Sequence, residues 1–315
     1  MFKRKIRKLL KKKIVPAPVF NWYFQRRVNQ RKEALSDLLG NSRPLLDQLS
    51  EERQQYWRPR IELVVECPDN ADIPRVPEAG KVIDGQLVMH NGLRIDPFSY
   101  YSYPMLDMLM QNRGVHEPQE EKAFRAVLDS LPAGKPYTFL ELGAYWAFYS
   151  MWFLQQFPEA RCIMVEPDRE NLYFGKENFR LNGLQGEFLH YGIGKAINSE
   201  NNVTTVDEIC RRKNIDFVDI LHTDIQGYEL EMLQGAEQLL KEQRVGFVFI
   251  STHSAELHAN CKQILIEKYG FQLVADVDLE ESFSWDGILV MKAAHYNGLE
   301  QVAVSKRKMN KKSSV

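Results

Sequence analysis

The sequence lacks closely spaced cysteines, long apolar runs and, near its start, an apolar segment of the signal-peptide type. Its four cysteines, Cys67, Cys162, Cys210 and Cys261, are far apart, and no two have the spacing of a metal site or a redox pair. No apolar run approaches the length of a membrane span, and the basic start has no apolar core of the signal-peptide type. Three of the cysteines sit in apolar or helical patterns, which favours packed, reduced thiols and a cytoplasmic location.

Acidic residues are missing from both ends of the chain. Residues 1–32 hold twelve Lys or Arg, residues 305–315 hold five, and neither segment contains Asp or Glu. The middle of the chain therefore carries only 24 of the 41 basic residues, against all 42 acidic ones. An acidic body is a poor surface for nucleic acid, so we expect no nucleic-acid partner.

Residues 1–14 combine positive charge with a helical apolar period. One face of a helix here would carry Phe2, Ile6, Leu9, Leu10 and Ile14, and lysines and arginines would cover the rest. This pattern is typical of a helix lying on an anionic membrane. A solvated basic tail is the alternative, and co-sedimentation with anionic vesicles at low salt distinguishes the two.

Turn signals and changes of period divide the chain into four parts. Residues 61–66 alternate like a strand, and Asp84-Gly85 and Asn91-Gly92 are hairpin turn signals. The parts that we expect are a basic amphipathic helix with a helical linker (1–60), a small β-rich extension (61–116), the main domain (117–296) and a basic disordered tail (297–315).

The main domain alternates strands with helices. Seven strands are predicted, at residues 137–142, 162–165, 187–193, 217–223, 245–252, 271–277 and 288–292. The connection before the last strand is short and has no helical pattern, so we expect that strand to be antiparallel. These features predict the Rossmann-like α/β fold of the class I methyltransferases, which use S-adenosylmethionine, preceded by a helical and small β extension.

The first strand of this domain leads into a tight turn. Gly143 and Ala144 allow the chain to turn sharply and a ligand to approach the backbone. Glu166 ends the next strand, where an acid accepts hydrogen bonds from ribose hydroxyls. Tyr145 and Ala147 occupy the places of the second and third glycines of a dinucleotide fingerprint. A pyrophosphate would meet the tyrosine ring, whereas S-adenosylmethionine carries no phosphate.

Polar side chains follow the fourth and fifth strands. Asp224 ends the fourth strand and His253 ends the fifth, so both should face the cleft at the carboxyl edge of the sheet. An aliphatic hydroxyl needs a base of near-neutral pKa to attack a sulfonium methyl group, and neutral His253 oriented by Asp224 would serve. His222 is the competing base. A histidine at a strand end is also common as a structural residue.

Residues 117–292 resemble the FkbM-type family of S-adenosylmethionine-dependent O-methyltransferases. The segments that carry the resemblance are Glu117-Pro118-Gln119-Glu120, Glu141-Leu142-Gly143-Ala144, Val165-Glu166-Pro167 with Asn171, and Asp224-Ile225-Gln226-Gly227-Tyr228-Glu229 followed by Leu233 and Gly235-Ala236. The sequence departs from the commoner family pattern at Tyr145, Ala147, His222 and Gln226, where Asn, Gly, Lys and Glu are usual.

The turn and the resemblance together predict the site. The residues expected to hold the cofactor are Glu117, Glu141, Gly143, Ala144, Tyr145, Trp146, Glu166, Pro167, Asn171 and Gly192. The residues expected at the acceptor are Gln226, Glu229 and Tyr101. The resemblance places Glu117 near the amino-acid end of the cofactor, and no resident metal is expected.

The predicted activity is methylation of a hydroxyl group on a sugar, glycan or natural-product acceptor. One alternative is a metal-assisted O-methyltransferase with Asp224, His253 and His258 as ligands. The other is a catalytically inactive methyltransferase-fold scaffold at a membrane, which the unusual Tyr145 turn favours. Saturable cofactor binding would distinguish an enzyme from that scaffold. If residues 1–14 bind the membrane, we expect the protein to be peripheral, at the inner face of that membrane.

Overall fold

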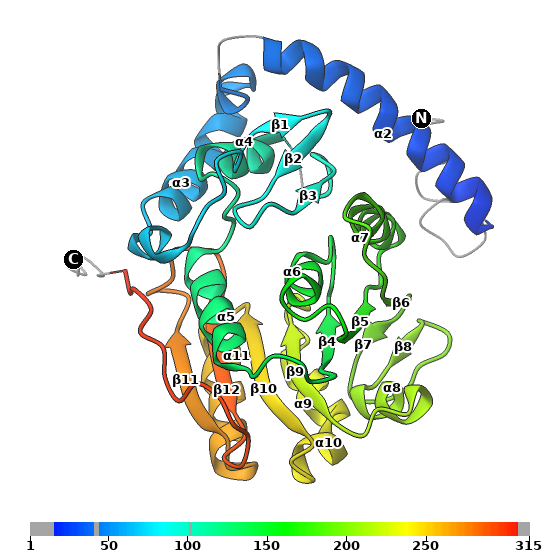
Figure 1. Cartoon of the computed structure of the whole chain (residues 1–315), viewed down its shortest axis with the longest axis vertical. Helices are drawn as coiled ribbons and strands as arrows, with labels where there is room; N and C mark the ends of the chain where they lie inside the picture. Colours follow the sequence, from blue (N-terminus) through cyan, green and yellow to red (C-terminus); the bar gives the residue numbers. More distant parts are fainter. Residues whose placement is uncertain (1–15, 41–43, 101–102, 308–315) are drawn as a thin grey trace.

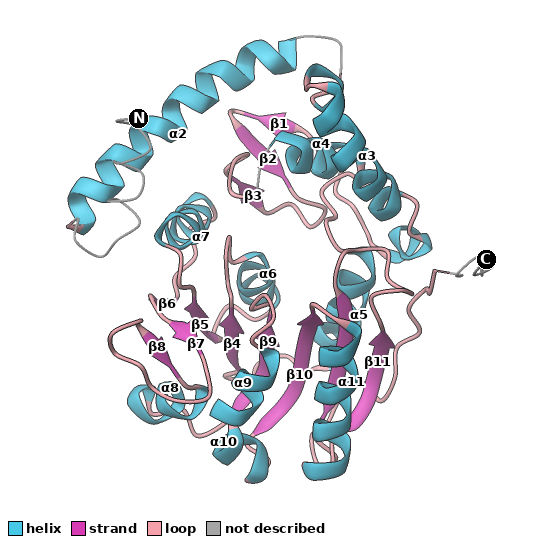
Figure 2. Ribbon diagram, turned by 180° about the vertical axis from the view of Figure 1, so that it is seen from behind, coloured by secondary structure: helices cyan, strands magenta, loops and turns pink. Residues whose placement is uncertain are grey.

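A seven-stranded sheet lies at the centre of the computed structural model, which describes residues 16–40, 44–100 and 103–307. Its strand order is β11-β12-β10-β9-β4-β5-β6 (Figures 1 and 2). These strands are β4 (Thr138–Leu142), β5 (Arg161–Val165), β6 (Glu187–Leu189), β9 (Val218–Thr223), β10 (Val245–Thr252), β11 (Gln272–Val277) and β12 (Gly287–Lys292). In this described sheet, β12 runs opposite to the other six strands, which are parallel to one another. The arrangement confirms the predicted class I methyltransferase fold.

Helices cover both faces of the sheet. One face packs against α5 (Pro118–Ser130), α6 (Phe148–Gln156) and α7 (Arg169–Leu181). The other packs against α8 (Val206–Lys213), α9 (Glu229–Gly235), α10 (Glu237–Lys241) and α11 (Ala255–Gln263), which continues into a π-helical turn, Ile264–Lys268. Successive strand residues point to opposite faces, so Phe139 packs in one core and Leu140 in the other. All eight residues of β10 are buried, as expected of a parallel strand covered on both faces.

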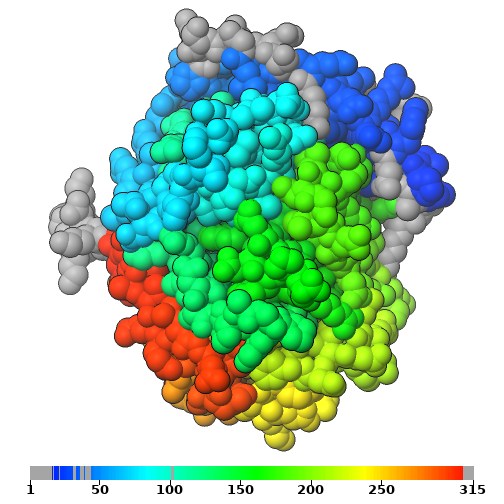
Figure 3. Space-filling model, in the orientation of Figure 1, coloured from blue at the N-terminus to red at the C-terminus, as the bar shows by residue number. Residues whose placement is uncertain are grey.

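The N-terminal extension lies at the carboxyl ends of the parallel strands (Figures 1 and 2). Its elements are α2 (Ala17–Gly40), α3 (Glu51–Val65), β1 (Val82–Ile83), β2 (Gln86–Val88), β3 (Arg94–Ile95), α4 (Tyr103–Gln111) and two 3-10 turns, Leu46–Gln48 and Pro68–Asp72. Figure 3 shows it, in blue and cyan, packed against the green residues of the main domain. Because ligands of open α/β sheets bind at that edge, the extension is placed to form part of the site.

A buried cluster of histidines and carboxylates joins the extension to the main domain. His90 of the extension lies 3.0 Å from a carboxylate oxygen of Glu121 on α5, and both side chains are buried. The other oxygen of Glu121 accepts the backbone N–H groups of His116 and Glu117. Burial alone would lower the pKa of His116, but the charges of Glu121 and Glu117 outweigh it and raise that pKa to about 10. The paired charges fix the extension over the sheet edge.

Both hairpin turns of the extension are confirmed. Asp84-Gly85 connects β1 to β2, and Asn91-Gly92 lies between β2 and β3. Both residues of the first turn have positive φ, 53° and 72°, which suits this short hairpin. All four cysteines are free and buried, whereas three had been predicted to be packed thiols.

Two predictions of secondary structure were wrong. Residues 61–66, predicted as a strand, lie at the end of α3, where Ile61 and Val64 are buried with the three-residue spacing of a helix. The predicted strand 187–193 is two short strands, β6 and β7 (Gly192–Ile193), and the second pairs with β8 (Val203–Thr204).

The predicted membrane helix, residues 1–14, and the predicted acceptor residue Tyr101 lie outside the described residues. Within the described ranges, no helix is long and apolar enough to cross a membrane. Residues 297–307, the described part of the predicted tail, run along the domain without regular structure. There Ser305 donates its backbone N–H to Asp69 at 2.7 Å.

Candidate active site

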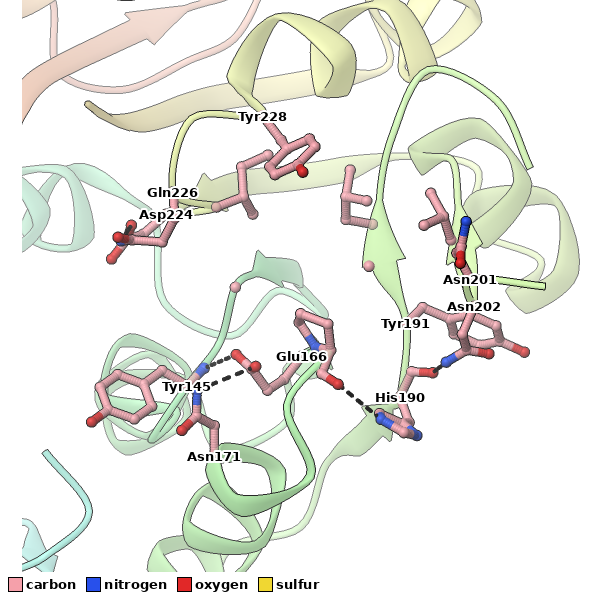
Figure 4. Close-up of a pocket in the computed structure, with 16 residues that line it drawn as sticks. Tyr145, Glu166, Asn171, His190, Tyr191, Asn201, Asn202, Asp224, Gln226 and Tyr228 are labelled. Carbon is pink, nitrogen blue, oxygen red and sulfur yellow. Dashed lines mark hydrogen bonds between the residues drawn. The ribbon is translucent and has the colours of Figure 1, made fainter. Parts of the chain in front are cut away.

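A cavity of about 780 Å³ opens at the carboxyl ends of β4, β5 and β9 (Figure 4). Eight residues predicted from the sequence line it: Gly143, Tyr145, Glu166, Pro167, Asn171, Gly192, Asp224 and Gln226. Eight more line it without having been predicted: His190, Tyr191, Ile193, Asn201, Asn202, Val203, Ile225 and Tyr228. The cavity is large enough for a nucleoside with an amino-acid side arm.

The turn after β4 forms one wall of the cavity. Gly143 has a φ of 71°, and its N–H and that of Ala144 both bond the carbonyl of Val165, at 2.9 and 3.0 Å. Tyr145 and Ala147 also have positive φ, 48° and 60°. At these two positions, where a dinucleotide site has glycine, the backbone therefore has the positive φ that favours glycine although the residues carry side chains. Helix α6 begins only at Phe148, so the turn spans residues 143–147.

Glu166 lies between this turn and α7. One of its carboxylate oxygens accepts the N–H of Tyr145 at 3.0 Å, and the other accepts the N–H of Asp168 at 2.7 Å and the side-chain amide of Asn171 at 3.3 Å. Figure 4 shows Tyr145, Glu166 and Asn171 on one wall of the cavity. Burial raises the pKa of Glu166 to about 7, although the hydrogen bonds oppose the shift. A carboxylate fixed this way is suited to accept hydrogen bonds from ribose.

The cofactor affinity should therefore depend on pH. Ribose hydroxyls donate to the ionised carboxylate, so a proton on Glu166 competes with the ligand below its pKa of about 7. We expect the Kd for S-adenosylhomocysteine, measured by calorimetry, to rise roughly tenfold from about pH 8 to about pH 6. Glu166→Ala should cost about 1.5–3 kcal/mol at the higher pH. Glu166→Gln should remove the pH dependence; the same pH profile in that variant would contradict this placement.

Four predicted cofactor residues lie away from the cavity wall. Glu141 is buried within β4 and accepts a hydrogen bond from the hydroxyl of Ser150. Ala144 and Trp146 are buried, and the Trp146 ring stacks on Tyr100 at 4.8 Å. Glu141 precedes the turn, and Ala144 and Trp146 lie within it, so all three pack into the core and hold the turn in place.

Glu117 is the fourth. It immediately precedes α5, and its carboxylate accepts a hydrogen bond from the hydroxyl of Tyr149 at 3.2 Å. Its charge helps to raise the pKa of Asp286, so it belongs electrostatically to the carboxylates around His253.

His253 and Asp224 form the central pair of that group. The Nε2 atom of His253 lies 3.2 Å from a carboxylate oxygen of Asp224, which lines the cavity, and 3.4 Å from one of Asp286. Its Nδ1 atom lies 2.8 Å from the fully buried carboxylate of Glu229. Burial alone would lower the pKa of His253, but hydrogen bonds to Asp224 and Glu229 and the charge of Asp286 raise it to about 10. The imidazole is therefore protonated at neutral pH.

Glu229, predicted to bind the acceptor, instead holds His253 in place. Gln226 is exposed, and its side-chain amide donates to Asp224 at 2.7 Å. His222, the competing base, is buried and lies 2.7 Å from Glu120. Its ring packs on Tyr149 with centroids 4.2 Å apart. His222 therefore has the surroundings of a structural histidine, which was the alternative given for a histidine at a strand end.

Asp286 was not predicted, although the strand pairing explains its position. In the antiparallel pair β10–β12, Thr252 lies opposite Gly287. The residue after Thr252, His253, therefore meets the residue before Gly287. Burial, Asp224 and Glu117 together raise the pKa of Asp286 to about 7. The antiparallel direction was predicted from the sequence, but the register was not.

The proposed metal ligand His258 belongs to a different cluster. Its two ring nitrogens lie 2.9 Å from the hydroxyl of Thr252 and 2.7 Å from a carboxylate oxygen of Asp276. Among the residues that the structure describes, no group of three or more His, Cys, Asp or Glu side chains is arranged to hold a metal ion. The described geometry therefore gives the metal-assisted alternative no ligand set.

Comparison with known proteins bears on the identity of the domain. Residues 173–273 match the family described as the methyltransferase FkbM domain. The match confirms the predicted FkbM resemblance over this segment. It includes Asp224, Glu229 and His253, but ends before Asp286 and begins after the Gly143 turn. Together with the sheet order, the match supports a domain of the S-adenosylmethionine-dependent methyltransferase type.

Solved structures with a related arrangement are distant in sequence. The chain is similar to M. capricolum TrmK in complex with S-adenosylhomocysteine, with 11% identity over 55% of this chain and 68% of that one and a TM-score of 0.39. It is also similar to the METTL16 MTase domain, with 10% identity over 73% of this chain and 90% of that one and a TM-score of 0.44. No curated protein sequence matches the chain significantly.

Proposed function

We propose that the protein is an O-methyltransferase that transfers the methyl group of S-adenosylmethionine to a hydroxyl group of a sugar, glycan or natural-product acceptor. The observation that carries this proposal is the Asp224–His253 pair, 3.2 Å apart, with Asp224 on the wall of the cavity that Glu166 also lines. A carboxylate that is held by a neighbouring cation, at the edge of a nucleoside site, suits deprotonation of a hydroxyl.

S-adenosylmethionine, when bound, supplies an electrophilic methyl group and leaves as S-adenosylhomocysteine. Asp224 accepts a hydrogen bond from the acceptor hydroxyl and so orients its oxygen. The hydroxyl becomes strongly acidic as its oxygen gains the methyl carbon, so the carboxylate that accepts its hydrogen bond suffices to take the proton. Glu141 and Trp146, buried beneath the turn, keep the cavity wall in place.

His253 takes a different part from the neutral base predicted from the sequence. With a pKa of about 10 its ring already carries the proton, so it cannot accept another at neutral pH. We assign proton acceptance to Asp224 and assign to His253 the positioning of that carboxylate. Glu229, whose carboxylate is fully buried, fixes the imidazolium from its opposite nitrogen.

The test is to identify the methylated product. Full-length protein is incubated with methyl-labelled S-adenosylmethionine and fractionated acceptors, and a base-stable methyl ether is expected. Label released by mild alkali would indicate a carboxyl acceptor, and label on nitrogen an amine acceptor; either would contradict the proposal. Saturable cofactor binding without transfer to any fraction would favour the inactive scaffold. Membrane association through residues 1–14, and with it a peripheral location, stays a prediction.

A further inference from the structure

An exposed aromatic cluster lies where the extension meets the loop between β11 and β12. Tyr56, Trp57 and Arg60 come from α3, and Trp285 comes from the loop; we call these four residues the aromatic platform. The rings of Trp57 and Trp285 are parallel within 7°, with centroids 6.1 Å apart. Tyr56 stands at 83° to Trp285, at 5.6 Å. The rings therefore form a corner with two apolar walls.

The platform is open to solvent and positively charged. Tyr56 is 59% exposed and Trp285 is 39% exposed, which is unusual for side chains of this size. The guanidinium carbon of Arg60 lies 3.3 Å from the centroid of the Trp285 ring. A hollow of about 380 Å³ adjoins these residues and is also bordered by Arg307, and no acidic side chain is among its described lining residues.

The platform is linked to the active site through Asp286. Trp285 immediately precedes Asp286, whose carboxylate lies 3.4 Å from His253, and His253 in turn lies 3.2 Å from Asp224 on the cavity wall. Arg60 is also close enough to lower the pKa of Asp286 by its charge. A molecule on the platform would therefore extend toward the carboxylate that we propose takes the proton.

We propose that the aromatic platform binds a sugar ring of the acceptor that bears an anionic group, either a carboxylate or a phosphate. This inference rests on the proposed function, because it takes the acceptor to be a hydroxyl compound. The C–H face of a pyranose packs on an exposed indole or phenol ring, and the corner offers one ring face and one ring edge. Guanidinium groups recognise carboxylates and phosphates in a planar, two-point geometry.

The charges also set the direction of the acceptor. Asp224 and Asp286 would repel an anionic group at the methylation end, whereas Arg60 and Arg307 would attract it at the platform end. The sugar that receives the methyl group therefore lies beside Asp224, and the anionic sugar lies one or more units away. The extension thus contributes directly to acceptor selection.

The experiment measures oligosaccharide binding to the full-length protein saturated with S-adenosylhomocysteine. The probes are a glucuronate-containing oligosaccharide, a neutral malto-oligosaccharide and inorganic phosphate alone. Their binding is measured by calorimetry. We expect saturable binding of the acidic probe and at least about tenfold weaker binding in Trp285→Ala and in Tyr56→Ala. Arg60→Gln should remove the preference for the acidic over the neutral probe. Inorganic phosphate that competes with the acidic probe would identify phosphate as an accepted anion.

The matched control is Trp22→Ala. Trp22 on α2 is 62% exposed and has Arg26 over its ring at 5.8 Å, but it does not line the hollow, so this variant should bind like the parent. Equal binding by the parent and Trp285→Ala, or no saturable binding of either oligosaccharide, would overturn the inference. Dissociation of a dimer by Trp285→Ala would instead mark an interface between copies. Binding needs no turnover, so failure of the methylation proposal would appear separately.

Discussion

Replacing Asp224 by asparagine should lower kcat by about 10²–10⁴-fold and leave the affinity for S-adenosylhomocysteine nearly unchanged. The amide has the size of the carboxylate but cannot accept the hydroxyl proton, and it cannot pair with the charged ring of His253 at 3.2 Å. The measurement is steady-state methyl transfer to the acceptor found by product labelling, together with calorimetry of cofactor binding. Because Asp224 lines the cavity without holding the ribose site, the loss should fall on kcat and not on cofactor affinity.

Asp276→Asn is the matched control for that variant. Asp276 forms a second aspartate–histidine pair, 2.7 Å from His258, on strand β11 and outside the cavity lining. Its loss should lower thermal stability while leaving kcat within about twofold of the parent. If Asp224→Asn keeps the parental kcat, Asp224 is not the proton acceptor. If His222→Ala loses activity without losing stability, the competing base predicted from the sequence takes that role.

The sheet could be predicted because its strands are covered on both faces. Such strands appear in the sequence as short, nearly continuous apolar runs, and residues 245–252 were predicted at the bounds that the structure has. The reversal of the last strand was predicted from its short connection, which has no helical pattern. The strand predicted at residues 61–66 was wrong because six residues are too few to distinguish the two periods. A helix with two buried residues three apart, Ile61 and Val64, can show the same pattern.

The site was predicted in part, for a physical reason. Gly143, Glu166 and Asp224 end parallel strands, and topology brings parallel strand ends together. Asp286 and Glu229 reach His253 through the register of an antiparallel pair and the start of a helix, which no local pattern reports. Gly192 was predicted, but the cavity residues His190, Tyr191, Asn201 and Asn202 lie beside the two-residue strands β7 and β8, which are too short to leave a periodic signal in the sequence.

The charge state of His253 could not be predicted from sequence at all. A histidine at a strand end was expected to titrate near neutrality, but three carboxylates converge on its ring from three different elements. Their combined effect exceeds the cost of burial and raises the pKa of His253 to about 10. Only the three-dimensional arrangement therefore distinguishes a neutral base from an imidazolium that positions a carboxylate.

Replacing Gly143 by alanine should abolish cofactor binding and destabilise the fold by about 3 kcal/mol or more. Gly143 has a φ of 71°, which by itself costs a side chain about 1–2 kcal/mol. An added Cβ would also collide with the backbone carbonyl oxygen of Asp224 and would lie 2.8 Å from its carbonyl carbon. The backbone N–H of Asp224 bonds the carbonyl of Leu142 at 3.0 Å, so neither strand end can move without losing a ladder bond.

Gly134→Ala separates the steric effect from the conformational one. Gly134 has a similar φ, 77°, but an added Cβ would meet no atom within 4 Å. Thermal denaturation of Gly134→Ala should show a loss of only about 1–2 kcal/mol, with calorimetry showing parental affinity for S-adenosylhomocysteine. Equal losses of stability in the two variants would mean that the contact between the β4 turn and Asp224 is not tight. In that case the turn after β4, which forms one wall of the cavity, would not lie as close to Asp224, the proposed proton acceptor, as the structure places it.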